Sequence, residues 1–287
     1  MTSTTALQEF SLKHKQYPEL LRSIYQPPQT LFVNGTIPKG TMIAIVGSRR
    51  PTEYGRSIAY RFAYDLARAG LIIVSGLAYG IDSIVHQAVL DAGGTTVAVI
   101  GSGLDSIYPR VHTPLAQRII LSGGAVLSEY PAGTPGLPHH FPARNRIIAG
   151  LSEAIIVPEA DARSGSLITA SLGLQENRTI LAIPGPITSP RSAGPNNLLK
   201  AGAFPVTEPA EVCEILGVTP PPNQALEPGK TKLQTSILQE LQTKALTSDQ
   251  IAIKLKTPIP QLLGQLTQLE IDGRITNIGA QTWQLVG

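Results

Sequence analysis

The feature that most constrains this fold is a repeated alternation of short apolar segments and longer helix-like ones. Residues 42–46, 71–75 and 95–100 are almost continuously apolar, and a glycine follows each of them. Strands without polar alternation are typical of a parallel sheet covered by helices on both faces. The sequence therefore predicts an α/β, doubly wound, mainly parallel sheet. Further strands are expected at 124–128, 154–157 and 179–183, and helices at 54–69, 80–91, 112–121, 144–151 and 166–176.

A proline-rich stretch at 218–231 separates this region, residues 1–217, from a C-terminal segment of different character, residues 232–287. That segment predicts a small winged helix, with helices at 233–241, 251–255 and 258–271 and a hairpin of 274–278 with 281–285. Winged helices bind duplex DNA or protein partners. Six basic and four acidic residues between 230 and 287 leave both possibilities open.

The charge of the chain predicts local rather than general affinity for polyanions. A formal net charge of +3 over 287 residues excludes a strongly basic surface. Acidic residues are absent, however, between Glu129 and Glu153 and again between Glu176 and Glu208. Arginine and lysine occur in both stretches, so we expect a cationic groove built from a few positions.

The first of these stretches contains the candidate ligands for a nucleic-acid strand. It places His140, Phe141, Arg144, Asn145 and Arg146 within seven residues. Guanidinium groups bind phosphates, and an aromatic ring stacks on an unpaired base. This combination favours single-stranded nucleic acid, although a helix start with a few exposed arginines is an equally simple interpretation of the segment alone.

Four loops follow the carboxyl ends of predicted strands, where open parallel sheets bind their ligands. They span 47–52, 75–80, 101–105 and 159–166. Glycines in such loops let backbone N–H groups approach a phosphate closely, and Arg49 adds a guanidinium to the first loop. Glycines that only make turns are the alternative for each loop taken singly.

A few residue types limit the cellular compartment and the kinds of chemistry that we expect for this chain. A single cysteine, Cys213, excludes an internal disulfide and favours a reducing cytoplasm. No apolar run reaches membrane-spanning length, the histidines lack zinc-ligand spacing, and no cofactor motif is complete. Asp82 and His86 are spaced as an acid–base pair on a helix, but such a pair is more often a structural contact.

Taken together, these motifs resemble the DprA/Smf family of DNA-processing proteins in collinear order from about residue 17 to residue 216. The resemblance implies an extended Rossmann-like domain that binds single-stranded DNA without catalysis, protects incoming strands in natural transformation, loads the RecA recombinase and forms homodimers. Pro158 stands where the family usually has valine, and we expect it to end the strand before the Ser164 loop. The matching residues are Val46-Gly47-Ser48-Arg49, Tyr54-Gly55, Ser75-Gly76-Leu77-Ala78, Gly80-Ile81-Asp82, His86, Gly103-Leu104-Asp105, Tyr108-Pro109, Ser128-Glu129-Tyr130-Pro131, Phe141 to Arg146, Ser164-Gly165, Thr169-Ala170, Pro184-Gly185, Gly194 and Asn196.

The leading hypothesis is thus a cytoplasmic recombination mediator and not an enzyme. Arg49, Arg144 and Arg146 are expected on phosphates and Phe141 on a base; the resemblance adds Gly47, Ser48, Ser164, Gly165 and Asn196. One alternative is a nucleoside monophosphate hydrolase on the same fold, with Asp82, Glu129 or Glu159 as its acid. Another is a transcription factor that uses the winged helix.

Overall fold

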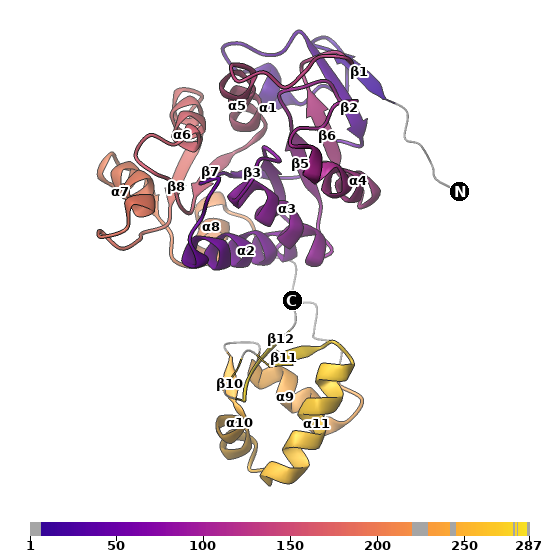
Figure 1. Ribbon diagram of the computed structural model, residues 1–287, viewed down its shortest axis with the longest axis vertical. Helices are drawn as coiled ribbons and strands as arrows, with labels where there is room; N and C mark the ends of the chain where they lie inside the picture. Colours follow the sequence, from indigo (N-terminus) through magenta and orange to yellow (C-terminus); the bar gives the residue numbers. More distant parts are fainter. Residues whose placement is uncertain (1–6, 220–228, 242–244, 278, 280, 286–287) are drawn as a thin grey trace. The chain divides into compact units, whose positions relative to one another are not determined.

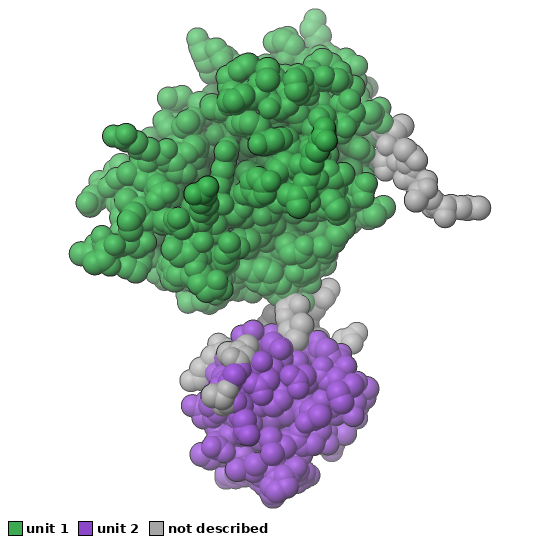
Figure 2. Space-filling model, viewed as in Figure 1, with its two compact units in different colours: residues 1–220 green, residues 221–287 purple. Residues whose placement is uncertain are grey.

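The computed structural model describes residues 7–219, 229–241, 245–277, 279 and 281–285. The chain divides into two compact units, residues 1–220 and residues 221–287 (Figure 2). Most of the predicted proline-rich linker, residues 220–228, lies outside the described residues. Each unit has a hydrophobic core of its own.

Unit 1 is built on a nine-stranded sheet in the order β1-β2-β6-β5-β4-β3-β7-β8-β9, as described (Figure 1). The strands from β6 to β9 run parallel, whereas β1 and β2 form an antiparallel addition at one edge. This confirms the predicted α/β class. The bounds are β1 Gln8–Ser11, β2 Thr30–Gly35, β3 Met42–Ile45, β4 Ile72–Ser75, β5 Thr96–Val99, β6 Ala125–Ser128, β7 Ala154–Val157, β8 Thr179–Ala182 and β9 Phe204–Pro205.

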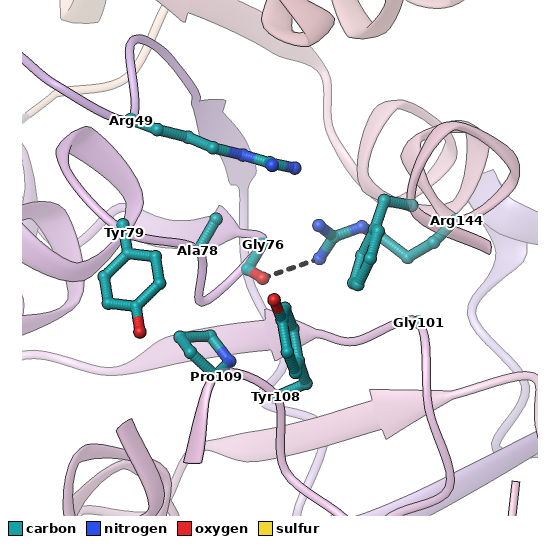
Figure 3. A pocket seen from close by; sticks show the side chains of 9 residues that line it. Arg49, Gly76, Ala78, Tyr79, Gly101, Tyr108, Pro109 and Arg144 are labelled. Carbon is teal, nitrogen blue, oxygen red and sulfur yellow. Dashed lines mark hydrogen bonds between the residues drawn. The ribbon is translucent and has the colours of Figure 1, made fainter. Parts of the chain in front are cut away.

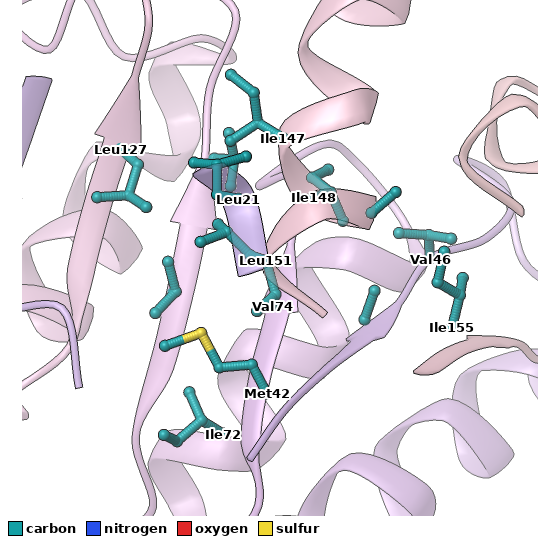
Figure 4. Close-up of a cluster of buried hydrophobic side chains, with 14 of the residues drawn as sticks. Leu21, Met42, Val46, Ile72, Val74, Leu127, Ile147, Ile148, Leu151 and Ile155 are labelled. Carbon is teal, nitrogen blue, oxygen red and sulfur yellow. The ribbon is translucent and has the colours of Figure 1, made fainter. Parts of the chain in front are cut away.

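Helices cover both faces of this sheet because successive strand residues point in opposite directions. Met42 and Ala44 belong to the core cluster shown in Figure 4, whereas Ile43 and Ile45 belong to the cluster on the other face. Helices α1 (Glu19–Arg22), α5 (His140–Leu151) and α6 (Gly165–Gln175) pack on the first face. The second face carries α2 (Glu53–Arg68), α3 (Ile81–Asp91), α4 (Thr113–Leu121) and α8 (Pro209–Leu216).

The structure differs from the sequence expectation at several places in unit 1, among them one edge of the sheet and residues 190–200. The antiparallel β1–β2 pair was not expected. Residues 191–197 were expected to form a loop, but Pro190–Ser192 form a 3-10 turn and Ala193–Lys200 form helix α7. Glycine, proline and asparagine give this segment the composition of a turn. Pro195 is nevertheless tolerated because it lies in the first turn of the helix, where its missing N–H has no partner to lose.

Unit 2 has the predicted winged-helix arrangement. Trp283 closes its core, and the indole Nε1–H donates to Ser248 Oγ at 2.9 Å. Thr247 caps α10 by accepting the Gln250 backbone N–H, as its sequence pattern indicates. The elements are α9 (Lys232–Leu241), β10 (Leu246–Thr247), α10 (Ser248–Leu255), α11 (Ile259–Ile271), β11 (Ile275–Asn277) and β12 (Thr282–Leu285), with the strand order β10-β12-β11.

Two features are absent from the residues that the structure describes. None of the helices in this part of the chain is long and apolar enough to span a lipid bilayer. No group of three or more histidine, cysteine, aspartate or glutamate side chains in it is arranged to hold a metal ion.

Candidate nucleic-acid interface

The order β5-β4-β3-β7-β8-β9 within the sheet places a topological switch point between β3 and β7. From β3 the chain proceeds to β4 and β5 on one side, while β7, β8 and β9 extend the sheet on the other. Ligands of open α/β sheets bind beyond the carboxyl ends of the strands at such a point. The loops that follow β3, β4, β5 and β7 are therefore the first place to look for a site.

A pocket opens at this edge, displaced from the switch point toward β4 and β5. It lies between three strand-end loops and the start of α5. Figure 3 shows arginine and tyrosine side chains around its mouth. The lining residues are Arg49 after β3; Gly76, Ala78 and Tyr79 after β4; Gly101, Tyr108 and Pro109 after β5; and Phe141 and Arg144 on α5.

A cation and two aromatic rings meet at the mouth of this pocket. The guanidinium carbon of Arg49 lies 5.8 Å from the centroid of the Phe141 ring. The Tyr108 ring lies 5.4 Å from Phe141, centroid to centroid, at an angle of 36°. Arg49, Tyr79 and Tyr108 are exposed, and Phe141 is half-buried. The pocket thus presents a positive charge and ring faces to solvent together.

Arg144 forms the floor of the pocket and is almost wholly buried, with 4 % of its surface exposed. Its Nη1 donates to the carbonyl of Gly76 at 2.7 Å and to that of Val99. Burial lowers the pKa of the guanidinium to about 10, although the nearby Asp82 acts in the opposite direction. Arg144 was expected to be a free ligand for phosphate. In the structure its guanidinium is instead bonded to two strand-end carbonyls.

Asp82 completes this floor from helix α3. Its Oδ2 accepts the N–H of Gly76 at 3.1 Å and that of Ala78 at 3.4 Å. Burial raises the pKa of this carboxyl, while Arg144 and the two backbone N–H groups work against the increase. A Cβ at Gly76 would lie 2.6 Å from both Arg144 Nη atoms and from Asp82 Oδ2. Only glycine fits between the carboxylate and the guanidinium.

His86 does not form the acid–base pair with Asp82 that its spacing suggested as an alternative. Its Nδ1 lies 2.8 Å from Thr96 Oγ1, and that hydroxyl donates to the carbonyl of Ile73. Since the hydroxyl proton is used, Nδ1 must be the donor, and the fully buried Nε2 has no partner among the described residues. Burial lowers the pKa of His86 to about 3, so this imidazole is a neutral core group at physiological pH.

Arg146 lies outside the pocket lining, unlike Phe141 and Arg144 on the same helix. Its two Nη atoms donate to the carboxylate of Glu129 at 2.8 and 2.7 Å, and its Nε donates to the carbonyl of Gln26. Residues 141 and 144 are three apart and share a face of α5, whereas residue 146 points elsewhere. The expected contact of Arg146 with phosphate therefore stays a prediction. The ion pair with Glu129 competes with such a contact.

The neighbouring candidates on α5 hold loops in place. His140 Nδ1 lies 3.0 Å from the carbonyl of Gly101, and its ring stacks on Tyr130 with centroids 4.0 Å apart. Asn145 Nδ2 donates to the carbonyl of Gly165 at 3.2 Å. Both side chains connect α5 to strand-end loops, so they position the edge of the pocket rather than line it.

The remaining candidates also lie near the edge of the sheet without lining the pocket. Ser48 is buried and its Oγ accepts the N–H of Arg50, which shapes the loop beside Gly47. Ser164 caps α6 at Gly165 by accepting the Ser166 N–H. Asn196 bonds both backbone groups of Gly185. A direct role of these residues in binding stays a prediction.

Tyr79 and Tyr108 are lining residues to which sequence reasoning gave no role. Each is an exposed aromatic in a strand-end loop, 51 % exposed in both cases. For Tyr79 the available signal was an aromatic side chain next to Gly80 in such a loop; Tyr108 has no glycine beside it. Tyr79 also packs edge-on against His112, whose Nδ1 lies 2.7 Å from the carbonyl of Leu77.

Comparison with known proteins agrees with this architecture. Residues 9–217 match the family described as DNA recombination-mediator protein A, and residues 219–279 match the DprA winged helix domain. The chain belongs to the DprA/Smf family of DNA-processing proteins, which confirms the resemblance.

Individual relatives cover most of the chain. It is 39 % identical to Protein Smf of Escherichia coli over 273 residues, which are 91 % of this chain and 73 % of that protein. It is 45 % identical to DNA processing protein DprA of Streptococcus pneumoniae over 205 residues, 71 % of this chain and 72 % of that protein.

Two solved structures support the fold of unit 1. The X-ray structure of DprA from Streptococcus pneumoniae superimposes with a TM-score of 0.68 at 43 % identity, covering 74 % of this chain and 75 % of the other. The structure of DNA processing protein A from Helicobacter pylori, described in terms of its single-stranded DNA binding mode, gives 0.65 at 30 % identity and covers 74 % and 97 %.

Proposed function

We propose that this protein binds single-stranded DNA at the pocket between Arg49, Tyr108 and Phe141 and acts as a recombination mediator. The observation that carries the proposal is the meeting of the Arg49 guanidinium and the Phe141 ring at the mouth of one pocket. A guanidinium binds phosphate, and aromatic rings stack on bases of any identity. The site thus suits a polynucleotide without a fixed sequence.

Single strands are favoured over duplexes by the position of the rings. Tyr79 and Tyr108 lie in strand-end loops and Phe141 lies at the start of α5, and all three line one pocket. A base reaches such rings only when it is unstacked from its neighbours. In a duplex, unpairing and unstacking one base costs about 2–3 kcal/mol. A flexible strand avoids this cost.

We further propose that the protein catalyses no reaction on the DNA. The three acids considered for a hydrolase are all engaged in structural contacts: Asp82 with backbone N–H groups, Glu129 with Arg146, and Glu159 with Thr52. His86 lies in the core with a strongly lowered pKa, so it is a poor general base near neutral pH. These observations favour binding over nucleotide hydrolysis.

RecA loading, protection of incoming DNA and homodimer formation, in the cytoplasm, complete the proposal. The family description as a recombination mediator supports the first two. For the dimer, β9 is an edge strand of the sheet and Phe204 on it is 55 % exposed. β9 has only two residues and Pro205 has no N–H to donate, so a dimer contact here would be made by the apolar Phe204 side chain rather than by strand pairing. Light scattering on wild type and Phe204→Glu tests the dimer.

The decisive experiment compares single-stranded and duplex DNA of equal length, by fluorescence anisotropy, with and without RecA. We expect tighter binding to the single strand, weakened by added salt and by either Arg49→Glu or Phe141→Ala. Lys39→Glu is the matched control, because Lys39 is an exposed cation in the loop before β3, at the opposite edge of the sheet, and does not line the pocket. Wild-type affinity in both pocket variants would remove the assignment, and release of free base from nucleotides would favour the hydrolase.

A further inference from the structure

The crevice at the switch point between β3 and β7 is occupied by a side chain of the protein itself. In open α/β sheets this crevice receives the phosphates of a bound nucleotide, at the N-terminus of the helix that follows the first strand. Here that helix is α2, and the residue in the crevice is Glu159, in the loop after β7. Only 1 % of Glu159 is exposed.

The carboxylate of Glu159 makes contacts that a bound phosphate would make. Its Oε2 accepts the backbone N–H of Thr52 at 2.8 Å, and its Oε1 accepts the Thr52 hydroxyl at 2.6 Å. Thr52 is the N-cap of α2, and its Oγ1 accepts the N–H of Gly55 in the first turn. The anion is therefore bonded to the cap of a helix of 16 residues.

The loop from β3 to α2 is wrapped closely around this residue. The backbone carbonyl of Glu159 accepts the N–H of Ser48 at 2.7 Å. A Cβ at Gly47 would lie 2.7 Å from that carbonyl oxygen and 2.7 Å from Ile81 Cγ1, and a Cβ at Gly55 would collide with the carboxylate. Gly55 is thus explained by the space that Glu159 takes, and Gly47 by Glu159 together with Ile81, rather than by the approach of an external ligand.

Among the described residues, no basic side chain is paired with the buried carboxylate of Glu159. Within the described parts of the chain, no lysine or arginine lies within 4.0 Å of the Glu159 carboxylate. The two donors of Thr52 and the partial positive charge at the start of α2 are what stabilise it. These are the same groups that stabilise phosphate in nucleotide-binding relatives of this fold.

We propose that Glu159 is a tethered anion that occupies the phosphate site of the fold, excludes nucleotide phosphate from it, and holds the 47–52 loop so that Arg49 reaches Phe141. The exclusion stands on the contacts of Glu159 alone. The positioning of Arg49 rests on the proposed function, because its readout is the binding of single-stranded DNA. Glu159 is thus a positioning residue that never touches the strand.

The test removes the carboxylate and supplies it again from solution. Glu159→Ala deletes a carboxymethyl group, and acetate carries the same group. We expect the variant to bind inorganic phosphate in calorimetric titration, which wild type does not, and to bind single-stranded DNA at least about tenfold more weakly, as loss of a charged hydrogen-bond pair implies. Sodium acetate should restore DNA binding, whereas sodium chloride of equal ionic strength should not.

Asp161→Ala is the matched control, since Asp161 is an exposed acid two positions further along the same loop. It should bind DNA as wild type does and show no response to phosphate or acetate. Glu159→Gln is a second variant that keeps the volume and leaves no space for acetate. It should weaken DNA binding without rescue, and it keeps the test valid where Glu159→Ala does not fold.

Each result decides one part of the proposal. A folded Glu159→Ala protein that binds DNA as wild type does would overturn the positioning role, and so would weak binding that acetate leaves unchanged. Absence of phosphate binding by that variant would overturn the exclusion. Wild type that fails to bind single-stranded DNA contradicts the proposed function instead, and the phosphate titration still decides whether Glu159 occupies an anion site.

Discussion

The guanidinium carbon of Arg49 lies 5.8 Å from the centroid of the Phe141 ring, so a cation from the loop after β3 covers an aromatic face from the start of α5. Such pairs are stabilised by the quadrupole of the ring. In the free protein each side chain therefore holds the other in place. We therefore expect Arg49 and Phe141 to act in binding as one unit rather than as two separate contacts.

The first prediction follows from this unit. Arg49→Ala and Phe141→Ala should each weaken binding of single-stranded DNA, and the double variant should lose less than the sum, with a coupling of about 1 kcal/mol. Anisotropy titrations of the four proteins give the cycle. Arg49→Ala with Lys39→Ala is the control pair and should be additive. Additive losses for Arg49 and Phe141 would show that the contact has no role in binding.

A second prediction separates stability from binding on helix α5. Arg146 and Glu129 are joined by two short hydrogen bonds and are both largely buried, with 21 % and 17 % of the side chains exposed. Arg146→Ala and Glu129→Gln should each lower the free energy of unfolding by about 1–2 kcal/mol in urea titrations. The affinity for single-stranded DNA should change much less than in Arg49→Ala. An equal loss of affinity in Arg146→Ala would restore its expected phosphate contact.

The third prediction concerns the glycine between Asp82 and Arg144. Gly76→Ala would place a methyl group 2.6 Å from atoms of both side chains. We expect a loss of about 1–3 kcal/mol in stability, together with weaker DNA binding because the floor of the pocket must shift. Gly264→Ala is a suitable control, since Gly264 lies in helix α11 of unit 2 and nothing lies within 4 Å of its added Cβ. Near-normal stability of Gly76→Ala would mean that the floor tolerates rearrangement.

A fourth prediction uses the buried imidazole of His86. Its pKa is lowered to about 3, so between that pH and its ordinary value of about 6.5 the unfolded chain binds a proton that the folded chain does not. The free energy of unfolding therefore carries no penalty from His86 above pH 6.5. It decreases as the pH falls from 6.5 toward 3, with a slope of up to about 1.4 kcal/mol per pH unit.

The measurement is the free energy of unfolding of wild type and His86→Asn at several pH values. The Asn variant keeps a donor for Thr96 but does not titrate. The difference between the two proteins should shrink as the pH is lowered from 6.5. A constant difference would contradict the burial argument, and comparing the two removes the contribution of Asp82, whose raised pKa acts in the opposite direction.

The fifth prediction concerns the winged helix. Helix α11 contains no lysine or arginine between Ile259 and Ile271, and its exposed positions include Gln261, Thr267, Gln268 and Glu270. A helix that enters the major groove depends on basic residues to meet the phosphates. Residues 1–219 should therefore keep the affinity for single-stranded DNA, and residues 229–287 should show no preference for a duplex in gel-shift assays. Tight duplex binding by the latter would support the transcription-factor alternative.

Most of the fold could be predicted from the sequence because buried parallel strands are apolar throughout. The strand at 154–157 was predicted with the bounds Ala154–Val157 that the structure has, and it ends before Pro158 as expected. The antiparallel pair β1–β2 was not predicted, because buried and exposed side chains alternate over only a few residues in these strands. Helix α7 escaped because its first turn has the composition of a loop.

The site was harder to predict than the fold, because contacts between distant segments leave no periodic trace. Helix α5 was expected to begin at residue 144, but it begins at His140, which puts Phe141 and Arg144 on one face and Arg146 on another. The partner of Arg146, Glu129, and the partner of Glu159, Thr52, come from other parts of the chain. Only the three-dimensional structure could identify them.

The pocket takes its walls from residue 49 through residue 144, so it does not exist until β3, β4, β5 and α5 have all come together. A nascent chain that has left the ribosome only as far as α4 has Arg49, Tyr79 and Tyr108, but it lacks the Phe141 ring that completes the mouth of the pocket. Under the proposed function, capture of a DNA strand is therefore a late property of synthesis, because a product without α5 lacks both Phe141 and Arg144.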